Sequence, residues 1–194
     1  MARHATTRER LLEANERYAA RPRSARALPA EPARQLAILT CMDARLDPLR
    51  FAGLREGDAH VIRNAGGRAS DDAIRSLVLS AAVLGTREWL VVHHTRCVLA
   101  GATDADVRRR VRAGLREAGT HVAPARLHGV DGLAMPDPAQ ALVDDVRRIR
   151  EHPLVSAAVE ISGWVLDVAS GRLAEVPEAT AAGRPLAGPV GAAG

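Results

Sequence analysis

Lysine is absent from this sequence of 194 residues, so all 27 of its basic side chains are arginines. A mechanism that uses a lysine nucleophile or a Schiff base is therefore excluded. Aromatic residues make up only 2% of the chain, which argues against a single-stranded nucleic acid as ligand, because such binding depends on aromatic side chains that stack on bases. The core must be aliphatic, and a hydrophobic content of 47% is sufficient for one domain.

Long hydrophobic segments are also missing. The first residues, Met-Ala-Arg-His-Ala-Thr-Thr, contain no apolar core of the kind found in secretory signals, and no run reaches the length of a membrane span. We therefore expect a cytoplasmic protein that does not bind a membrane. The two cysteines are Cys41 and Cys97, and in a reducing compartment such a pair more often binds metal or takes part in catalysis than forms a structural disulfide.

Two terminal segments differ in composition from the rest of the chain. Residues 6–20 predict a helix, because Thr6 and Glu9 have the spacing of a capping box and the following apolar positions form a weak stripe. With a linker rich in Arg, Pro and Ala, residues 1–33 are predicted to be a helical arm that lies on its own domain or on a partner subunit. Residues 177–194 are rich in Ala, Gly and Pro and are predicted to be a disordered tail.

Residues 34–176 alternate between short apolar runs and amphipathic segments. The runs predicted to be strands are 36–40, 59–63 and 88–94, and the segments predicted to be helices are 48–54, 70–84, 104–118 and 137–149. This order is typical of an α/β fold with a mostly parallel central sheet flanked by helices. Two further runs, 155–168 and 172–176, are joined by Ser170-Gly171 and predict a C-terminal β-hairpin.

Side chains able to bind metal stand at the ends of the predicted strands. Cys41, Asn64 and His94 each end or directly follow one of the first three strands, and Cys97 comes three residues after His94. Sites in parallel sheets form outside the carboxyl ends of the strands, so these residues should meet at one edge. Zinc prefers thiolate and imidazole ligands, and three protein ligands leave a fourth position open for catalysis. The alternative is that both cysteines are small buried hydrophobes and His94 is a core histidine.

Asp43 and Arg45 follow the first of these strands and are two residues apart, so in extended backbone they share a face. Such a pair can be a solvated ion pair of little consequence. Beside a metal, the arginine would keep the carboxylate ionised and oriented. Asp43 would then accept a hydrogen bond from zinc-bound water or would replace that water as the fourth ligand.

Three motifs, in this order and at these separations, resemble those of the β-class carbonic anhydrases, especially the shorter bacterial members. They are Cys41-Met-Asp43-Ala-Arg45, Val61-Ile-Arg63-Asn-Ala-Gly66-Gly67 and His94-x-x-Cys97. The resemblance covers about residues 34–176, which it identifies as a zinc-binding catalytic domain. It implies a zinc lyase that reversibly hydrates carbon dioxide to bicarbonate and a proton. The nucleophile would be zinc-bound hydroxide, formed from a bound water whose pKa is about 7.

The same resemblance implies roles for individual residues. One zinc ion per chain would be held by Cys41, His94 and Cys97. Asp43 would orient the hydroxide or, in a closed state, bind zinc as the fourth ligand, and Arg45 would draw Asp43 off the metal. The family also forms dimers in which an N-terminal helix packs on the neighbour, so a homodimer or a higher homo-oligomer is expected.

Two residues depart from the family pattern. Many relatives have Asp and Gly where this chain has Arg96 and Val98, which places a cation beside the metal and a side chain at a position that glycine often occupies. Two alternatives to carbon dioxide hydration therefore stay open. One is hydrolysis of carbon disulfide or carbonyl sulfide at the same site, and the other is a zinc-binding protein with little or no turnover.

Overall fold

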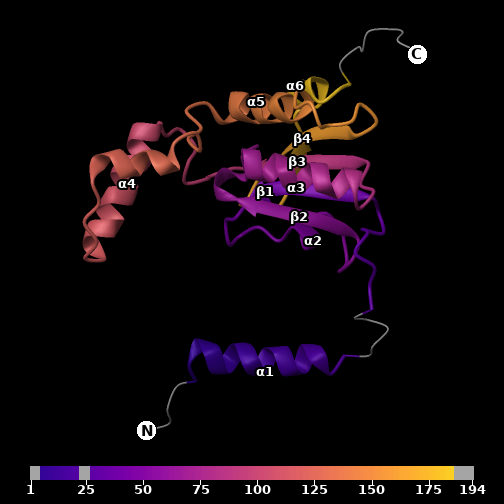
Figure 1. Ribbon diagram of the computed structural model, residues 1–194, viewed down its shortest axis with the longest axis horizontal. Helices are drawn as coiled ribbons and strands as arrows, with labels where there is room; N and C mark the ends of the chain where they lie inside the picture. Colours follow the sequence, from indigo (N-terminus) through magenta and orange to yellow (C-terminus); the bar gives the residue numbers. More distant parts are fainter. Residues whose placement is uncertain (1–4, 22–26, 186–194) are drawn as a thin grey trace. The chain divides into compact units, whose positions relative to one another are not determined.

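The apolar runs of the sequence form a five-stranded sheet with the order β2-β1-β3-β4-β5 in the computed structural model, which describes residues 5–21 and 27–185 (Figure 1). Strands β1 to β4 are parallel, and β5 pairs antiparallel with β4. The strands are β1 Leu36–Cys41, β2 Ala59–Asn64, β3 Glu88–His94, β4 Glu160–Leu166 and β5 Leu173–Glu175. The predicted α/β class with a mostly parallel sheet and a C-terminal hairpin is confirmed.

Helices precede the sheet, connect its first four strands and follow its last strand. They are α1 Thr7–Ala19, α2 Pro48–Phe51, α3 Asp71–Ala82, α4 Asp104–Glu117, α5 Pro138–Arg150 and α6 Pro177–Ala182, with short 3-10 helices η2 Ala65–Gly67 and η3 Pro124–Val130. Their starts follow local signals in the sequence. The Ser70 side chain accepts from the backbone of Ala73 at the start of α3, and α5 begins with a proline after the capping residue Asp137.

Strand β1 is buried along its whole length and separates two hydrophobic clusters. Because side chains alternate along a strand, Ala37 and Leu39 face one cluster and Leu36 and Ile38 face the other. The first cluster includes residues of α3, α5 and α6. The second reaches the carboxyl end of the strands and contains both cysteines and Val107 of α4. One part of the core therefore extends directly to the candidate site.

The prediction of a disordered tail over residues 177–194 is wrong for the described part, because helix α6 packs on the sheet. Ala179 is fully buried against Gly163 of β4, where any Cβ would collide with it. The buried Arg150 donates through Nε to the carbonyl of Gly183 at 2.7 Å. The small residues that led to the prediction of disorder therefore permit close packing here. Residues 186–194 of the predicted tail lie outside the described residues.

The chain divides into two compact units, Met1–Ala30 and Glu31–Gly194. The first contains the predicted N-terminal helix as α1, which begins at a capping box formed by Thr6 and Glu9 and has no buried residue. Part of the predicted linker, residues 22–26, lies outside the described residues. No helix in the described part of the chain is long and apolar enough to cross a membrane.

Candidate metal centre

The first three strands bring their final residues to one edge of the sheet. Cys41 ends β1, Asn64 ends β2, and His94 ends β3. Cys41 is paired with Asn64 across the two neighbouring parallel strands, and β3 lies on the other side of β1. The predicted meeting of these residues at the carboxyl edge is therefore present in the structure.

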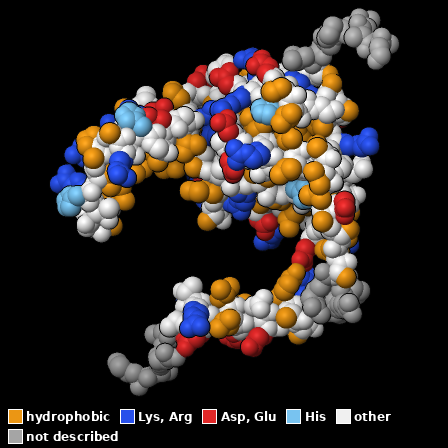
Figure 2. Space-filling view, in the orientation of Figure 1, with side chains coloured by type: hydrophobic (Ala, Val, Ile, Leu, Met, Phe, Trp, Pro, Cys, Tyr) orange, Lys and Arg blue, Asp and Glu red, His pale blue; other side chains and the backbone are white. Residues whose placement is uncertain are grey.

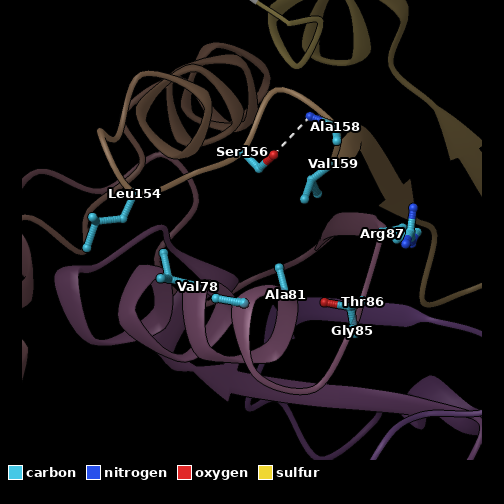
Figure 3. Close-up of a pocket in the computed structure, with 10 residues that line it drawn as sticks. Val78, Ala81, Gly85, Thr86, Arg87, Leu154, Ser156, Ala158 and Val159 are labelled. Carbon is cyan, nitrogen blue, oxygen red and sulfur yellow. Dashed lines mark hydrogen bonds between the residues drawn. The ribbon is translucent and has the colours of Figure 1, made fainter. Parts of the chain in front are cut away.

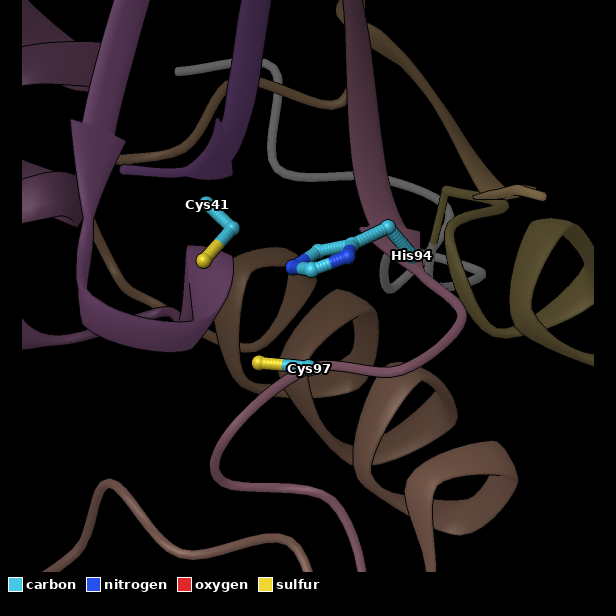
Figure 4. A group of neighbouring side chains, drawn as sticks. All are labelled: Cys41, His94 and Cys97. Atoms are coloured by element: carbon cyan, nitrogen blue, oxygen red, sulfur yellow. The ribbon is translucent and has the colours of Figure 1, made fainter. Parts of the chain in front are cut away.

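Cys41, His94 and Cys97 form a buried cluster at this edge. Their ligand atoms all lie within 4.8 Å of one another. The imidazole and both sulfurs point into the same space, with Cys97 contributed by the loop that follows β3 (Figure 4). Both cysteines are free thiols. No other group of this kind occurs among the residues that the structure describes.

The histidine is oriented for metal binding by its own loop. Nδ1 of His94 lies 2.9 Å from the carbonyl oxygen of Thr95, to which it donates a hydrogen bond. This contact leaves Nε2 as the atom with a free lone pair. Nε2 is buried, has no hydrogen-bond partner and is 3.9 Å from the nearest oxygen of Asp43. An unsatisfied buried nitrogen is unfavourable by about 1–3 kcal/mol, which a metal bond would offset. The donor set of two thiols and one imidazole fits zinc.

The charges of the cluster favour a cation. The thiol of Cys97 donates to the sulfur of Cys41 and lowers the pKa of Cys41 to about 4, and the backbone N–H groups of Asp43 and Gly66 act in the same direction against burial. The same contact with a thiolate, together with burial, raises the pKa of Cys97. Burial disfavours the charged imidazole of His94, yet the neighbouring Cys41 raises its pKa overall. A thiol that loses its proton readily in this way is a good ligand for a divalent cation.

Asp43 and Arg45 form a bidentate ion pair at the mouth of the cluster. Arg45 donates from Nε to Oδ1 at 2.9 Å and from its terminal nitrogen to Oδ2 at 2.7 Å, and its backbone N–H also donates to Oδ1. These bonds hold the pKa of Asp43 well below its usual range. The guanidinium donates further to the carbonyl of Arg96 at 3.0 Å. The carboxylate is therefore held by Arg45, which leaves space beside the three candidate ligands.

The two departures from the family pattern differ in their structural effect. Arg96 has a φ of 57°, in the left-handed region that few residues other than glycine adopt, whereas Val98 does not have a positive φ. Val98 is 68% exposed, and its carbonyl accepts from Arg110 at 2.6 Å. Val98 therefore shows no backbone strain from the loss of glycine, and the left-handed residue of this loop is Arg96, whose carbonyl accepts from Arg45.

A cavity of about 440 Å³ opens beside the cluster. Cys41, Cys97 and Asp43 form its polar part, and its walls are aliphatic side chains contributed mainly by Val98, Leu99, Val107, Val111, Val130 and Leu133. Such walls suit a small, neutral and apolar substrate. A different cavity of about 330 Å³ lies between α3 and the segment before β4 (Figure 3). Its lining includes Val78, Ala81 and Leu154 but no candidate metal ligand.

Arg63 and Asn64 support the site in ways that the sequence does not indicate, beyond the place of Asn64 at the end of a strand. Arg63 donates to the carbonyl of Cys41 at 3.0 Å and to the carbonyl of Asp43 at 2.7 Å, so it braces the backbone on both sides of the first motif. Asn64 bonds both backbone groups of Arg68 through its side chain and closes the turn after β2. Both residues belong to the second motif, Val61–Gly67. Carbonyl groups at the ends of strands need hydrogen-bond donors, and this need is the signal that could have indicated the role of Arg63.

Comparisons with known proteins agree with this geometry. A family model described as carbonic anhydrase matches residues 36–173. The chain is 41% identical over 151 residues to beta-carbonic anhydrase 1 of Mycobacterium tuberculosis, covering 77% of this chain and 86% of the relative. It is also 35% identical over 151 residues to a carbon disulfide hydrolase of Acidithiobacillus thiooxidans, with coverage of 72% and 76%.

Among solved structures, the crystal structure of a carbonic anhydrase from Streptococcus mutans superposes with a TM-score of 0.74. The two chains are 35% identical, and the match covers 90% of this chain and 99% of the other. The range matched by the family model, residues 36–173, contains strands β1 to β4 and all three residues of the cluster. The chain belongs to the β-class carbonic anhydrase family.

Proposed function

We propose that this protein catalyses the reversible hydration of carbon dioxide to bicarbonate at one zinc ion per chain, held by Cys41, His94 and Cys97. The observation that carries the proposal is the buried Nε2 of His94, which lacks a partner and shares a space less than 4.8 Å across with two free thiols. Zinc bound there supplies a Lewis acid that lowers the pKa of a coordinated water to about 7.

Asp43 and Arg45 control the position next to the three ligands. Arg45 keeps the carboxylate of Asp43 ionised, so that Asp43 can accept a hydrogen bond from the nucleophile and orient its lone pair toward carbon dioxide. Oδ2 of Asp43 lies 3.9 Å from Nε2 of His94. A rotation of the Asp43 side chain away from Arg45 would therefore bring its carboxylate to the position of the fourth ligand. That arrangement is the closed state of the site. The bonds of Arg45 to Asp43 and to the carbonyl of Arg96 oppose that rotation.

The apolar walls of the adjacent cavity support carbon dioxide as the substrate. A neutral molecule loses little hydration when it enters such a cavity, whereas the bicarbonate product is an anion that the same walls disfavour. Carbon disulfide has the same linear shape and is also apolar, and one relative of 35% identity is a carbon disulfide hydrolase. Carbon disulfide hydrolysis is therefore the second candidate for this site.

Stopped-flow carbon dioxide hydration from about pH 6.5 to 9, a range that brackets the value of about 7 for the coordinated water, tests the proposal when zinc content is measured in parallel. We expect one zinc per chain and a rate that rises with pH. Cys41→Ser should lose zinc and turnover together, and retention of full zinc in this variant would contradict the ligand assignment. One zinc per chain without carbon dioxide hydration at any pH would overturn the enzyme assignment, and release of hydrogen sulfide from carbon disulfide would then favour the second candidate.

We also propose that the protein is a homo-oligomer, at least a dimer. Helix α1 exposes hydrophobic side chains and buries none, with exposed fractions of 67% for Leu11 and 54% for Leu12 (Figure 2). A second copy of the chain would cover this surface. Light scattering after size-exclusion chromatography should give a dimer or a larger species for the wild type. Leu11→Asp with Leu12→Asp should yield a smaller species, and a wild-type monomer would contradict the proposal.

A cytoplasmic location is proposed on the basis of the two cysteines. A reducing compartment keeps Cys41 and Cys97 as thiols, whereas an oxidising one would favour a disulfide between such close sulfurs at the expense of the metal site. Cell fractionation with antibodies against the chain should recover it with cytoplasmic proteins. Recovery with an envelope or membrane fraction would contradict this location.

A further inference from the structure

A buried ion pair, Arg68–Asp145, lies behind the metal centre and has no role in the chemistry described so far. Asp145 of α5 is only 3% exposed, and the side chain of Arg68 in the turn after β2 is 14% exposed. The two residues are 77 positions apart in the chain. A buried ion pair is weak as a source of stability, because desolvation offsets most of its attraction. Its contribution should therefore be sought in the positions that it fixes.

Asp145 gathers three elements around one carboxylate. Its Oδ2 accepts from Nε of Arg68 at 2.7 Å, and its Oδ1 accepts from the backbone N–H of Ala69 at 3.1 Å. The same Oδ2 lies 3.1 Å from Nε2 of His93 in β3. Burial raises the pKa of Asp145, but the partners His93 and Arg68 outweigh it and keep the group ionised. The carboxylate thus joins α5 to the turn after β2 and to the strand that carries His94.

Arg68 extends this linkage across the cavity. Its terminal nitrogen donates to the carbonyl of Ala134 at 2.6 Å and more weakly to that of Leu133 at 3.4 Å. The aliphatic part of Arg68 packs on Gly66, where an added Cβ would lie 3.0 Å from its Cγ. Gly66 and Leu133 both line the cavity beside the cluster. One guanidinium therefore sets the separation between two walls of that cavity.

The turn held by Arg68 is in direct contact with a metal-binding residue. Gly67 in this turn lies against the backbone of Thr40 and Cys41 at the end of β1. A Cβ at Gly67 would lie 2.9 Å from the backbone nitrogen of Cys41, and Gly67 has a φ of 68°, so the turn fits against β1 only with glycine at this position. Displacement of Arg68 would therefore shift the turn that packs against the backbone of Cys41.

We propose that Asp145 and Arg68 are positioning residues of the metal centre. Asp145 acts through Arg68 and Ala69 to hold the Gly66-Gly67 turn against the backbone of Cys41 and to keep Gly66 and Leu133 at a fixed separation. The proposal rests on the zinc site of the proposed function. Outer partners of metal ligands typically change metal affinity or activity by about 10- to 100-fold when they are removed, and an effect of this size is expected here.

The test measures how fast the zinc-loaded protein releases zinc to an excess of a chromogenic chelator. Asp145→Asn and Arg68→Met should each release zinc about 10- to 100-fold faster than the wild type. Because both residues act through one linkage, the double variant should be little faster than either single variant. Asp144→Asn is the matched control, since Asp144 is the neighbouring carboxylate on α5, is 53% exposed and pairs with Gln140 and Arg147 of its own helix. This control should release zinc at the wild-type rate.

Conservative variants and substrate kinetics separate positioning from general stability. Arg68→Lys keeps the charge and part of the length of the side chain, so its rate of zinc release should lie between those of Arg68→Met and the wild type. If Asp145→Asn fails to fold, the comparison of Arg68→Lys with Arg68→Met still tests the proposal. In folded variants, KM for carbon dioxide should rise more than kcat falls, because the cavity walls move. A lowered melting temperature with an unchanged rate of zinc release would overturn the proposal.

These outcomes are distinct from those of the proposed function. A wild-type protein that holds zinc but does not hydrate carbon dioxide overturns the enzyme assignment and leaves the zinc-release comparison decisive for the Arg68–Asp145 pair. Equal release rates in the wild type and both single variants overturn the positioning role while carbon dioxide hydration stands. A wild-type protein that retains no zinc overturns both.

Discussion

The two ends of the central sheet differ in whether their polar side chains are hydrogen-bonded within the protein. At the amino end, four side chains form a continuous chain of hydrogen bonds. Nδ1 of His60 lies 2.8 Å from the hydroxyl of Ser80, that hydroxyl lies 2.8 Å from the hydroxyl of Thr86, and the indole of Trp89 donates to Thr86 at 3.0 Å. Each group finds its partner within the protein, so this end has little capacity left for a ligand.

The carboxyl end leaves bonding capacity unused. Nε2 of His94 has no hydrogen-bond partner there, and the sulfurs of Cys41 and Cys97 both lie near the imidazole. Asp43 is ionised beside them and is held by Arg45. Paired polar groups stabilise a fold, whereas convergent unpaired groups mark a binding site. Substitutions at the carboxyl end should therefore change zinc binding and turnover, and substitutions at the amino end should change the free energy of unfolding.

The largest effect is expected for His94→Ala. This change removes one of three ligands and leaves two thiols that cannot complete the site, so zinc content should fall from one per chain to near zero. Carbon dioxide hydration should fall by at least about 100-fold, since even the loss of an outer partner costs about 10- to 100-fold. Zinc analysis and stopped-flow kinetics measure both. His121→Ala, at an exposed histidine, is the matched control and should keep its zinc. Normal zinc content in His94→Ala would contradict the assignment of the carboxyl end as the metal site.

Asp43→Asn should separate zinc binding from turnover within the carboxyl end. The amide keeps the size of the carboxylate but loses the charge that accepts the hydrogen bond of the nucleophile. Carbon dioxide hydration should fall by about 100-fold or more, within the range of about 10²–10⁴ for groups of this kind, with zinc content unchanged. Asp47→Asn, in the helix cap four residues further on, is the control and should keep its rate. A wild-type rate in Asp43→Asn would assign Asp43 a purely structural role.

At the amino end, Thr86→Val should destabilise the fold without affecting zinc. The substitution keeps the shape of the side chain but removes the hydroxyl that bonds Trp89 and Ser80. Buried groups left without a partner should lower the free energy of unfolding by about 1–3 kcal/mol, or the melting temperature by about 2–4 °C per kcal/mol. Urea unfolding measures the change, and Thr86→Ser should keep most of the stability. A loss of zinc in Thr86→Val would show that the two ends are coupled.

The sequence contains more information about the carboxyl end than about the residues that support it. Cys41, Asn64 and His94 could be placed together, because each ends an apolar run and parallel strands align their carboxyl ends. The pairing of Asp43 with Arg45 was also expected, but its physical reason differs: residues 44 and 45 lie in a turn, where the backbone N–H of Arg45 donates to Oδ1 of Asp43. These are local patterns combined with one rule about sheets.

The supporting contacts could not be predicted from local patterns. Arg68 and Asp145 are 77 residues apart, and neither differs in its sequence surroundings from a surface residue. Helix α6 was missed because an Ala-rich segment with Gly and Pro resembles a disordered one until Gly163 is known to lie beneath Ala179. The left-handed backbone of Arg96 gave no signal either, because arginine is not a residue that favours it. Contacts between distant segments decide all of these features.

The smallest effect is expected from Asp167, which lies just after β4 at the carboxyl end. Its Oδ1 accepts from the hydroxyl of Thr95 at 3.0 Å and from the backbone of Ala169, and its Oδ2 accepts from the hydroxyl of Ser170 at 2.7 Å. These bonds, led by that of Ser170, lower the pKa of Asp167 to about 2. The carboxylate thus anchors Thr95, whose carbonyl orients the imidazole of His94.

The pKa of Asp167 fixes the pH range of its contribution to stability. Its pKa in the folded protein is below the value of about 3.9 expected in the unfolded chain, so the stabilisation is complete above about pH 4 and is lost as the pH falls toward about 2. Asp167→Asn should therefore be less stable than the wild type near neutral pH, and the difference should shrink through that range.

Urea unfolding of the zinc-free proteins measures this difference without interference from metal loss in acid. Asp72→Asn, at an exposed carboxylate of α3, serves as the control and should run parallel to the wild type. A stability difference for Asp167→Asn that stays constant from neutral pH to about pH 2 would mean that Asp167 acts through its shape and not through its charge. In that case the anchoring of Thr95 at the carboxyl end would resemble the hydrogen-bond chain at the amino end. The contrast between the two ends would then be limited to the metal ligands and the Asp43–Arg45 pair.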